Sequence, residues 1–288
     1  MNEIAVLGPS GTFSEFAAKK YIEKFNKNIK VVFYPTIKKV FDAIGKECEL
    51  GIVPIENTLD GYVQITLDLL SQVNLYIIHE FVIQVQFSFV SNNLNVSDIK
   101  KIYVQFKTQG QCYSFLDQFI EAKIITTASN GESFEKVKKG ILEESAIIPR
   151  HILNAENRFP FSIENVTDSE NNETRFIVIS KNIIKYDINK SYKTSVIIMD
   201  AADDKPGMLS KILNEFSERN INLTSIISRP TKRALGKYYF FIDIEGHYPE
   251  EKNIKQAIDK ISENNIVKIL GSSSMRSNWL YFAIRSER

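Results

Sequence analysis

The sequence predicts an α/β protein with two lobes, followed by a smaller domain in which strands and helices follow the order βαββαβ. From the N-terminus to about residue 180, short apolar runs alternate with stretches of helical periodicity, a pattern typical of parallel sheets covered by helices. The polar segment Lys181–Tyr192 has no clear period, and the order of elements changes after it. We expect one domain over residues 1–182, a second over 193–272 and a C-terminal extension over 273–288.

The first lobe is predicted from a strand–loop–helix unit that occurs three times in about 70 residues. Each strand is a short apolar run, and each helix has apolar residues three and four positions apart. The expected strands are Ile4–Leu7, Lys30–Tyr34 and Leu50–Pro54, and the expected helices are Phe13–Phe25, about Thr36 to Lys46, and one that follows the loop Ile55–Gly61 and ends at Leu70.

The second lobe is expected at about residues 76–162. A long extended stretch, Leu75–Ser91, leads into it, and the extended segments Ile163–Thr167 and Thr174–Ser180 lead back. Between them the α/β pattern repeats, with strands near 100–104, 123–126 and 145–148 and helices near 109–119 and 132–139. Two lobes joined by crossing strands form a cleft, which is a common place for a small ligand.

The segment after the linker has the order of a ferredoxin-like domain. Its predicted elements are the strands Ser195–Met199, Ile221–Ser228, Tyr238–Glu245 and Ile266–Leu270 and the helices Gly207–Arg219 and Glu251–Glu263. Pro206 suits the first position of its helix because the missing N–H is not needed there. The extension holds the single tryptophan, Trp279, and is expected to form an extra strand or a packing arm.

Charge and composition exclude several classes of protein. Lys+Arg total 36 and Asp+Glu total 35, so a nucleic acid or an anionic membrane is not expected as the main partner. Two cysteines and three scattered histidines form no disulfide or metal pattern, and nucleotide-binding fingerprints are missing, so neither a metal nor a cofactor is expected. Without a leader or a membrane-spanning apolar run, the chain is expected to be cytoplasmic.

Polar residues follow two of the predicted strands. In Gly8–Glu15, glycines precede a helix start, whose free N–H groups favour anions. A capping box made by Thr12 and Glu15 explains the same residues equally well. In Val53–Gly61, Glu56, Asn57 and Thr58 follow a buried strand. Capping of the next helix is the more ordinary interpretation there.

A third candidate segment is Thr174-Arg175-Phe176, at the start of an extended stretch. Arginine beside a hydroxyl could hold a carboxylate through a bidentate bond, although an exposed arginine at a strand start is commoner. Together the three segments offer hydroxyl, amide and guanidinium groups. We expect Thr12, Asn57 and Arg175 to meet in one cleft around a small anion such as a diacid.

At these residues the chain resembles the prephenate dehydratase family, over roughly residues 2–272. Asp168 and Asn172, ahead of Thr174, also stand at family-like positions. The C-terminal part resembles an ACT regulatory domain, and the segments that carry this resemblance are Lys205–Leu209, Ile227–Pro230 and Phe241–His247. The resemblance implies that the two lobes have a periplasmic-binding-protein-like fold.

The resemblance also implies a reaction, the conversion of prephenate to phenylpyruvate, water and carbon dioxide in L-phenylalanine biosynthesis. It implies that Thr174 bonds to the leaving oxygen and that Arg175 pairs with a substrate carboxylate. Because a threonine hydroxyl is a poor acid, a neighbouring group or water would carry the proton, and Glu56 is a candidate for that neighbour. Further substrate contacts are implied for Thr12, Ser14, Asn57, Thr58 and Phe176. Packing is the more ordinary role for Phe176.

The ACT resemblance implies feedback inhibition by L-phenylalanine bound between two subunits, and hence a homodimer or homotetramer. The implied binding residues are Gly207, Met208, Leu209, Ser210, Ile227, Ser228, Arg229 and Pro230. The sequence departs from the family in three places. Of the usual Ser-His-Pro-Gln run leading into Gln-Cys, only Gln111-Cys112 is present; Ala128–Glu132 matches an Ala-Ser-Thr-rich helix start only in part; and Ile227 replaces a glutamate.

Three alternatives stay open at this point. A prephenate decarboxylase on the same fold would keep the ring hydroxyl and would not need Thr174. An arogenate dehydratase would act on the amino-acid counterpart of prephenate. A non-catalytic amino-acid sensor would have an inactive cleft and a working ACT domain, which the Thr174-Arg175 pair disfavours.

Overall fold

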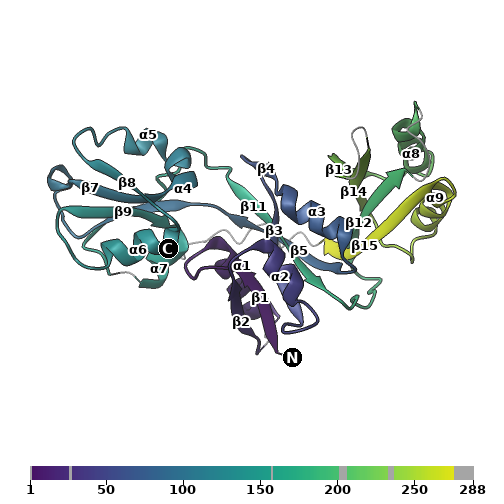
Figure 1. The fold of residues 1–288 in the computed structure, drawn as a ribbon, viewed down its shortest axis with the longest axis horizontal. Coiled ribbons are helices and arrows are strands. Elements are labelled where there is room, and N and C mark those ends of the chain that lie inside the picture. Colours follow the sequence, from purple (N-terminus) through teal and green to yellow (C-terminus); the bar gives the residue numbers. More distant parts are fainter. Residues whose placement is uncertain (1, 26–27, 157, 201–205, 233–236, 276–288) are drawn as a thin grey trace.

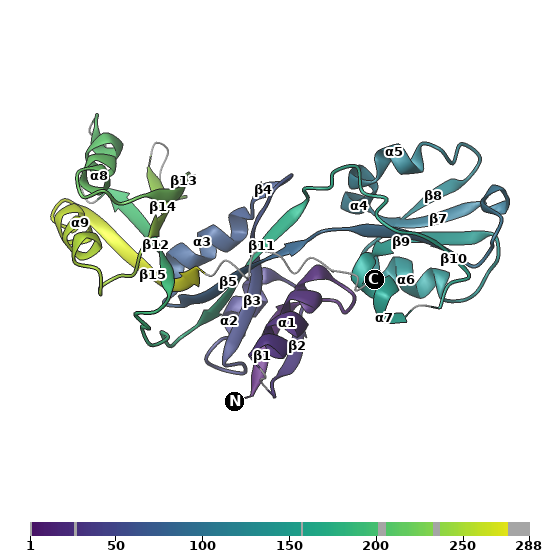
Figure 2. The ribbon, with the colours of Figure 1, turned by 180° about the vertical axis from the view of Figure 1, so that it is seen from behind.

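The computed structural model describes residues 2–25, 28–156, 158–200, 206–232 and 237–275. Three sheets form a row, with the first lobe in the middle, the second lobe at one end and the C-terminal domain (residues 191–275) at the other (Figures 1 and 2). Within these residues, helices long and apolar enough to cross a membrane are absent. Trp279 lies outside the described residues, and so does the extra strand or packing arm expected around it.

The first lobe is built on a mixed sheet with the strand order β2-β1-β3-β11-β5, and β4 pairs with β3. β1 runs parallel to β2 and β3, whereas β11 lies antiparallel between β3 and β5. The elements are β1 (Glu3–Leu7), α1 (Phe13–Lys24), β2 (Lys30–Tyr34), α2 (Ile37–Ala43), β3 (Leu50–Asn57), β4 (Gly61–Tyr62), α3 (Gln64–Gln72), β5 (Tyr76–Gln84) and β11 (Glu173–Ser180).

The two faces of this sheet have different covers. α1 packs on one face with Phe176 and Val178 of β11, and α2 and α3 pack on the other with Ile177 and Ile179. The strand therefore alternates as a strand buried on both sides must. The expected loop at 55–61 is instead a hairpin, because β3 continues to Asn57 and Gly61 takes a left-handed φ of 73°.

The second lobe has the strand order β10-β6-β9-β7-β8. The predicted long strand Leu75–Ser91 is two strands in different sheets, β5 and β6, because the chain crosses between the lobes after Gln84. The elements are β6 (Phe87–Ser91), η1 (Val96–Asp98), β7 (Lys101–Gln105), α4 (Phe106–Gln111), α5 (Tyr113–Leu116), β8 (Lys123–Thr127), α6 (Asn130–Val137), β9 (Glu144–Pro149), α7 (Arg150–Glu156) and β10 (Phe161–Ile163).

The C-terminal domain confirms the predicted βαββαβ order, with an antiparallel sheet in the order β13-β14-β12-β15. Its helix α8 begins at Met208 with Gly207 as a left-handed N-cap, so Pro206 precedes the helix rather than opening it. The elements are β12 (Ser191–Asp200), α8 (Met208–Ser217), β13 (Leu223–Pro230), β14 (Tyr238–Glu245), α9 (Lys252–Ser262) and β15 (Asn265–Met275).

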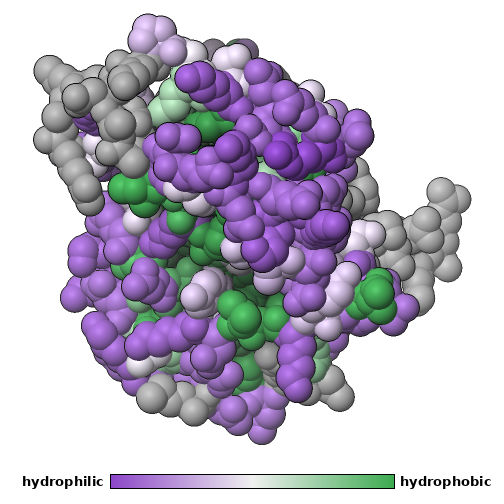
Figure 3. Space-filling view, turned by 90° about the vertical axis from the view of Figure 1, so that its right-hand side faces the viewer, coloured by the Kyte–Doolittle hydropathy of each residue, from purple (hydrophilic) through white to green (hydrophobic). Residues whose placement is uncertain are grey.

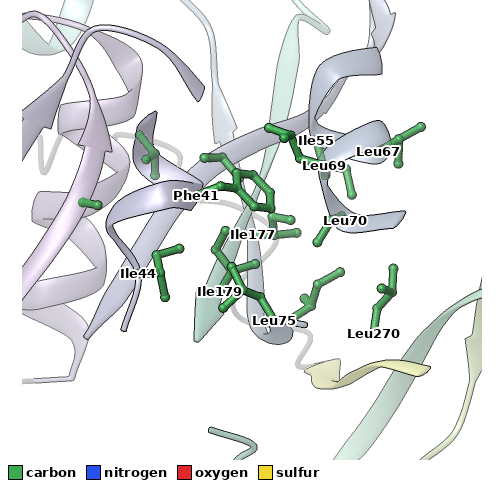
Figure 4. Packing of buried hydrophobic residues seen from close by; sticks show 14 of the residues in the cluster. Phe41, Ile44, Ile55, Leu67, Leu69, Leu70, Leu75, Ile177, Ile179 and Leu270 are labelled. Atoms are coloured by element: carbon green, nitrogen blue, oxygen red, sulfur yellow. The ribbon is translucent and has the colours of Figure 1, made fainter. Parts of the chain in front are cut away.

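The C-terminal sheet is covered on both faces. Helices α8 and α9 pack on one face. The other face packs on the first lobe, where Leu270 of β15 joins a hydrophobic cluster with Leu70, Leu75 and Ile177 (Figure 4). The outer end of the molecule, seen from the side of this domain, is mostly hydrophilic, with hydrophobic side chains gathered near the middle of the view (Figure 3). The C-terminal domain therefore shares a core with the strand that carries Thr174.

Candidate active site

The pairing of β3 with β11 places the predicted site residues in two cross-strand pairs. Thr174 lies opposite Asn57, and Arg175 lies opposite Glu56. Neighbouring residues of a strand point to opposite faces, so the two pairs lie back to back. A register shift between Arg175 and Phe176 inserts Ile55 as an extra residue in β3, and such a bulge changes the face to which the following side chains point.

The Asn57–Thr174 pair is held by a network of hydrogen bonds. Asn57 Nδ2 donates to Asn172 Oδ1 at 2.8 Å, to the Glu173 carbonyl at 3.0 Å and to Thr174 Oγ1 at 3.0 Å. Asn57 Oδ1 accepts two backbone N–H groups of the hairpin turn, those of residues 59 and 60, both at 2.9 Å. These bonds fix the amide orientation. Because the Thr174 oxygen accepts, its own hydrogen is available to donate to a ligand.

This network reaches the second lobe through residues outside the predicted site. Asn172, which is fully buried, donates to Gln111 Oε1 at 3.0 Å, and Gln111 is the last residue of α4. The Gln111 carbonyl accepts the Asp168 N–H at 2.8 Å. The sequence indicates both Asn172 and Gln111: Asn172 stands two residues before Thr174, and Gln111 belongs to the Gln111-Cys112 pair that matches the family pattern.

Thr58 orders the chain that leads into β11. Its Oγ1 donates to the Asn171 carbonyl at 2.8 Å and accepts the Glu173 N–H at 2.9 Å. Asp168 has a similar role in the second lobe, where its carboxylate accepts the N–H groups of Tyr113 and Ser114 at the start of α5. Neither Asn57 nor Thr58 caps α3, which has Val63 at its N-cap position.

Thr12 caps α1. Its Oγ1 accepts the Glu15 N–H at 3.3 Å, while the Glu15 carboxylate accepts from the Gly11 N–H at 2.6 Å and from the Ser10 hydroxyl at 2.8 Å. Burial on its own would raise the pKa of Glu15, but hydrogen bonds from Lys19, Gly11 and Ser10 lower it. Ser14 is buried in the first turn of the helix. The segment Gly8–Glu15 thus forms a capping box, in which Thr12 bonds to its own helix.

The same loop meets the second lobe. A Cβ atom on Gly131 would lie 2.5 Å from the Ser10 carbonyl oxygen, so the lobes approach each other here to backbone contact. A cavity of about 790 Å³ lies beside this contact, lined among others by Ser10, Glu15, Ser129 and His151. Its lining does not include the Asn57–Thr174 pair.

His151 of α7 bridges the lobes at this cavity. Its ring stacks on Phe16 of α1 with 4.4 Å between centroids and meets Phe13 edge-on at 5.1 Å. Burial lowers the pKa of His151 to about 4; Glu15 opposes the shift and Lys19 adds to it. The ring is therefore neutral at pH 7 and acts there as an apolar contact.

Arg175 is on the other face of the sheet from Thr174. Its Nη1 lies 2.7 Å from Asp243 Oδ2 and 3.3 Å from Glu80 Oε2, and its Nε lies 3.1 Å from Glu56 Oε2. Burial alone would lower the pKa of Arg175, but Asp243, Glu80 and Tyr62 raise it. The structure corrects the expectation that Thr12, Asn57 and Arg175 converge. Arg175 faces the C-terminal domain and pairs with protein carboxylates, and Glu56 lies beside it rather than beside Thr174.

Phe176 is buried in the core of the first lobe, 2% exposed, with its ring 6.2 Å from that of Phe81. Its contacts are those of a packing residue, the more ordinary of the two roles expected for it.

The segments implied to bind L-phenylalanine, 207–210 and 227–230, lie at the same end of the C-terminal sheet. β12 and β13 both run antiparallel to β14, so their last residues lie at the same end of the sheet, and α8 is the next helix after β12. The side chains of β13 alternate between the two faces of the C-terminal sheet. Ser228 and Pro230 are exposed, while Ile227 packs against the cluster shared with the first lobe.

Arg229 also reaches the first lobe, where its Nη2 lies 3.0 Å from each Asp68 carboxylate oxygen. Tyr239 donates to the same carboxylate at 3.0 Å. Burial would raise the pKa of Asp68, but Lys232, Arg229 and Tyr239 lower it. A segment implied to bind a regulator is thus tied directly to α3.

The fold and site define a two-lobed α/β protein with a polar network between its lobes and a ferredoxin-like domain packed on the first lobe. Comparison with known proteins then gives the family. The family model "Prephenate dehydratase" matches residues 4–183, and the model "ACT domain" matches residues 195–263. A prephenate dehydratase of Methanocaldococcus jannaschii is 33% identical over 270 residues, which cover 91% of this chain and 94% of that protein.

Two solved structures agree. Prephenate dehydratase from Arthrobacter aurescens in complex with L-Phe has 27% identity and a TM-score of 0.80, and the match covers 95% of this chain and 90% of that one. Prephenate dehydratase from Staphylococcus aureus Mu50 has 29% identity and a TM-score of 0.78, over 95% and 100% of the two chains. The chain belongs to the prephenate dehydratase family and is a carbon–oxygen lyase with a C-terminal ACT domain.

Proposed function

We propose that the protein converts prephenate to phenylpyruvate and that Thr174 assists the departure of the ring hydroxyl. The bond from the ring to the carboxylate breaks, its electron pair enters the ring, and the carbon–oxygen bond breaks as the ring becomes aromatic. The hydroxide leaves and takes up a proton to become water. The observation that supports this role is the hydrogen bond from Asn57 to Thr174 Oγ1, which orients the threonine as a donor.

The substrate would lie on the Asn57–Thr174 face of β11, away from Arg175. Thr12 and Ser14 at the start of α1 remain proposed contacts, because the N–H groups of a helix start favour a carboxylate. Thr58 would act by holding residues 171–173, since its hydroxyl makes both of its bonds there. Glu56 is paired with Arg175, so the proton that converts the departing hydroxide to water would be drawn from the solvent.

The reaction is tested by incubating the purified protein with prephenate and, separately, with arogenate and identifying the products. Phenylpyruvate from prephenate, at a rate that scales with protein concentration, is the expected result. Phenylalanine formed only from arogenate would assign an arogenate dehydratase. A ring that loses CO2 but keeps its hydroxyl would assign a decarboxylase, and no product from either would leave an amino-acid sensor.

We further propose that L-phenylalanine inhibits the enzyme by binding at the C-terminal domain of a homodimer or homotetramer. Two findings support this: the Arthrobacter relative is described in complex with L-Phe, and Arg229 joins the implied binding segment to Asp68 of the first lobe. Calorimetric titration with L-phenylalanine should give heat and should slow turnover. No heat at millimolar ligand would contradict the proposal and would point to Ile227 as the disabling departure. Light scattering gives the oligomeric state.

A further inference from the structure

Five charged side chains gather between the first lobe and the C-terminal domain, on the Arg175 face of the sheet. Arg175, Glu56 and Glu80 come from the first lobe, and Lys193 and Asp243 come from the C-terminal domain. Asp243 makes the shortest of the ion pairs to Arg175, at 2.7 Å. The two domains thus complete one charge cluster between them.

Asp243 is fixed in position. Its side chain is fully buried, and Ser195 Oγ donates to its Oδ1 at 2.6 Å while Lys193 Nζ lies 3.5 Å from its Oδ2. Arg175 is only 13% exposed. Without the Asp243 charge, Arg175 Nη1 loses its shortest ion pair and keeps the longer one to Glu80, so the guanidinium is expected to shift toward Glu80.

The cluster is one residue away from the proposed reacting group. Arg175 lies between Thr174 and Phe176 on β11, and its cross-strand neighbour Glu56 precedes Asn57 on β3. A shift of the Arg175–Glu56 pair therefore moves the backbone of the Asn57–Thr174 pair on the opposite face. Small displacements of a positioned group are costly in catalysis, on the order of a hundredfold for 1 Å.

We propose that Asp243 of the C-terminal domain is a positioning residue for catalysis, which acts through Arg175 to hold Thr174 in place. The inference rests on the proposed role of Thr174. It gives the C-terminal domain a part in the basal reaction, separate from any effect of a bound regulator.

The test is steady-state kinetics of Asp243→Asn with prephenate in the full-length protein. The substitution keeps the shape and the acceptor for Ser195 but removes the charge that pairs with Arg175. We expect kcat to fall roughly tenfold while KM changes by less than about twofold, because the substrate does not touch the cluster. Ser195→Ala loosens Asp243 without removing a charge and should lower kcat about threefold, which keeps the test open if Asp243→Asn does not fold.

Lys268→Met is the matched control. Lys268 bridges the same two domains through the carbonyls of Leu70, Ser71 and Val73, and none of these belongs to β11. This variant should lower the melting temperature and keep the parent kcat. Equal kcat values for Asp243→Asn and the parent, or an equal fall in kcat for Lys268→Met, would overturn the inference. If the parent itself leaves prephenate unchanged, the proposed function fails instead.

Discussion

His151 makes the contact between the lobes sensitive to pH, and the size of the effect follows from its burial. The folded pKa is about 4 and the ordinary value is 6.5, so the unfolded chain takes up a proton over a range in which the folded chain does not. The contribution of His151 to the free energy of unfolding is therefore present above pH 6.5 and is lost as the pH drops toward 4. The difference in pKa corresponds to about 3 kcal/mol in total, of which about 1 kcal/mol is lost by pH 5.5.

The perturbation is His151→Phe, which keeps a ring against Phe13 and Phe16 but does not titrate. Urea unfolding at pH 7.5 and pH 5.5 gives the free energy of unfolding for each protein. The variant should lose about 1 kcal/mol less than the parent between these pH values. Phe16→Leu is the control, because it should weaken the contact at both pH values and keep the dependence on pH. If His151→Phe loses as much stability as the parent, burial of this histidine is not the cause.

Two further predictions concern the geometry of the site. Gly131→Ala should raise KM several-fold in steady-state assays, because its Cβ would lie 2.5 Å from the Ser10 carbonyl and hold the lobes apart. Gly110→Ala is the control, because its Cβ would face open space and should leave KM unchanged. Equal KM values for Gly131→Ala and the parent would refute this prediction. Asn57→Asp should lower turnover roughly a hundredfold, because it replaces the donor to Thr174 by an acceptor facing other acceptors. Near-parental turnover in that variant would show that the network does not orient Thr174.

Much of the fold could be predicted from local patterns. The two lobes, the C-terminal domain and the βαββαβ order of that domain follow from apolar periodicity, which depends only on neighbours in sequence. That Thr174 and Arg175 point to opposite faces of the sheet could also be predicted, because adjacent side chains of an extended segment alternate between the two faces. Grouping Thr174, Arg175 and Phe176 into one site disregards this alternation.

The rest depends on contacts between distant parts of the chain. That Asn57 lies opposite Thr174 depends on the register between β3 and β11, which a bulge shifts. That Arg175 meets Asp243 depends on how the C-terminal sheet packs on the first lobe. Local sequence patterns specify neither the register of strands that are far apart in sequence nor the docking of two domains.

Turnover of prephenate by Thr174→Ala, compared with Thr174→Ser, examines the role of the hydroxyl most directly. The alanine variant should lose roughly a hundredfold or more in kcat, with a smaller change in KM, and the serine variant should recover much of that loss. Turnover by the alanine variant within a few-fold of the parent rate would contradict the assignment of Thr174 as the donor to the departing oxygen.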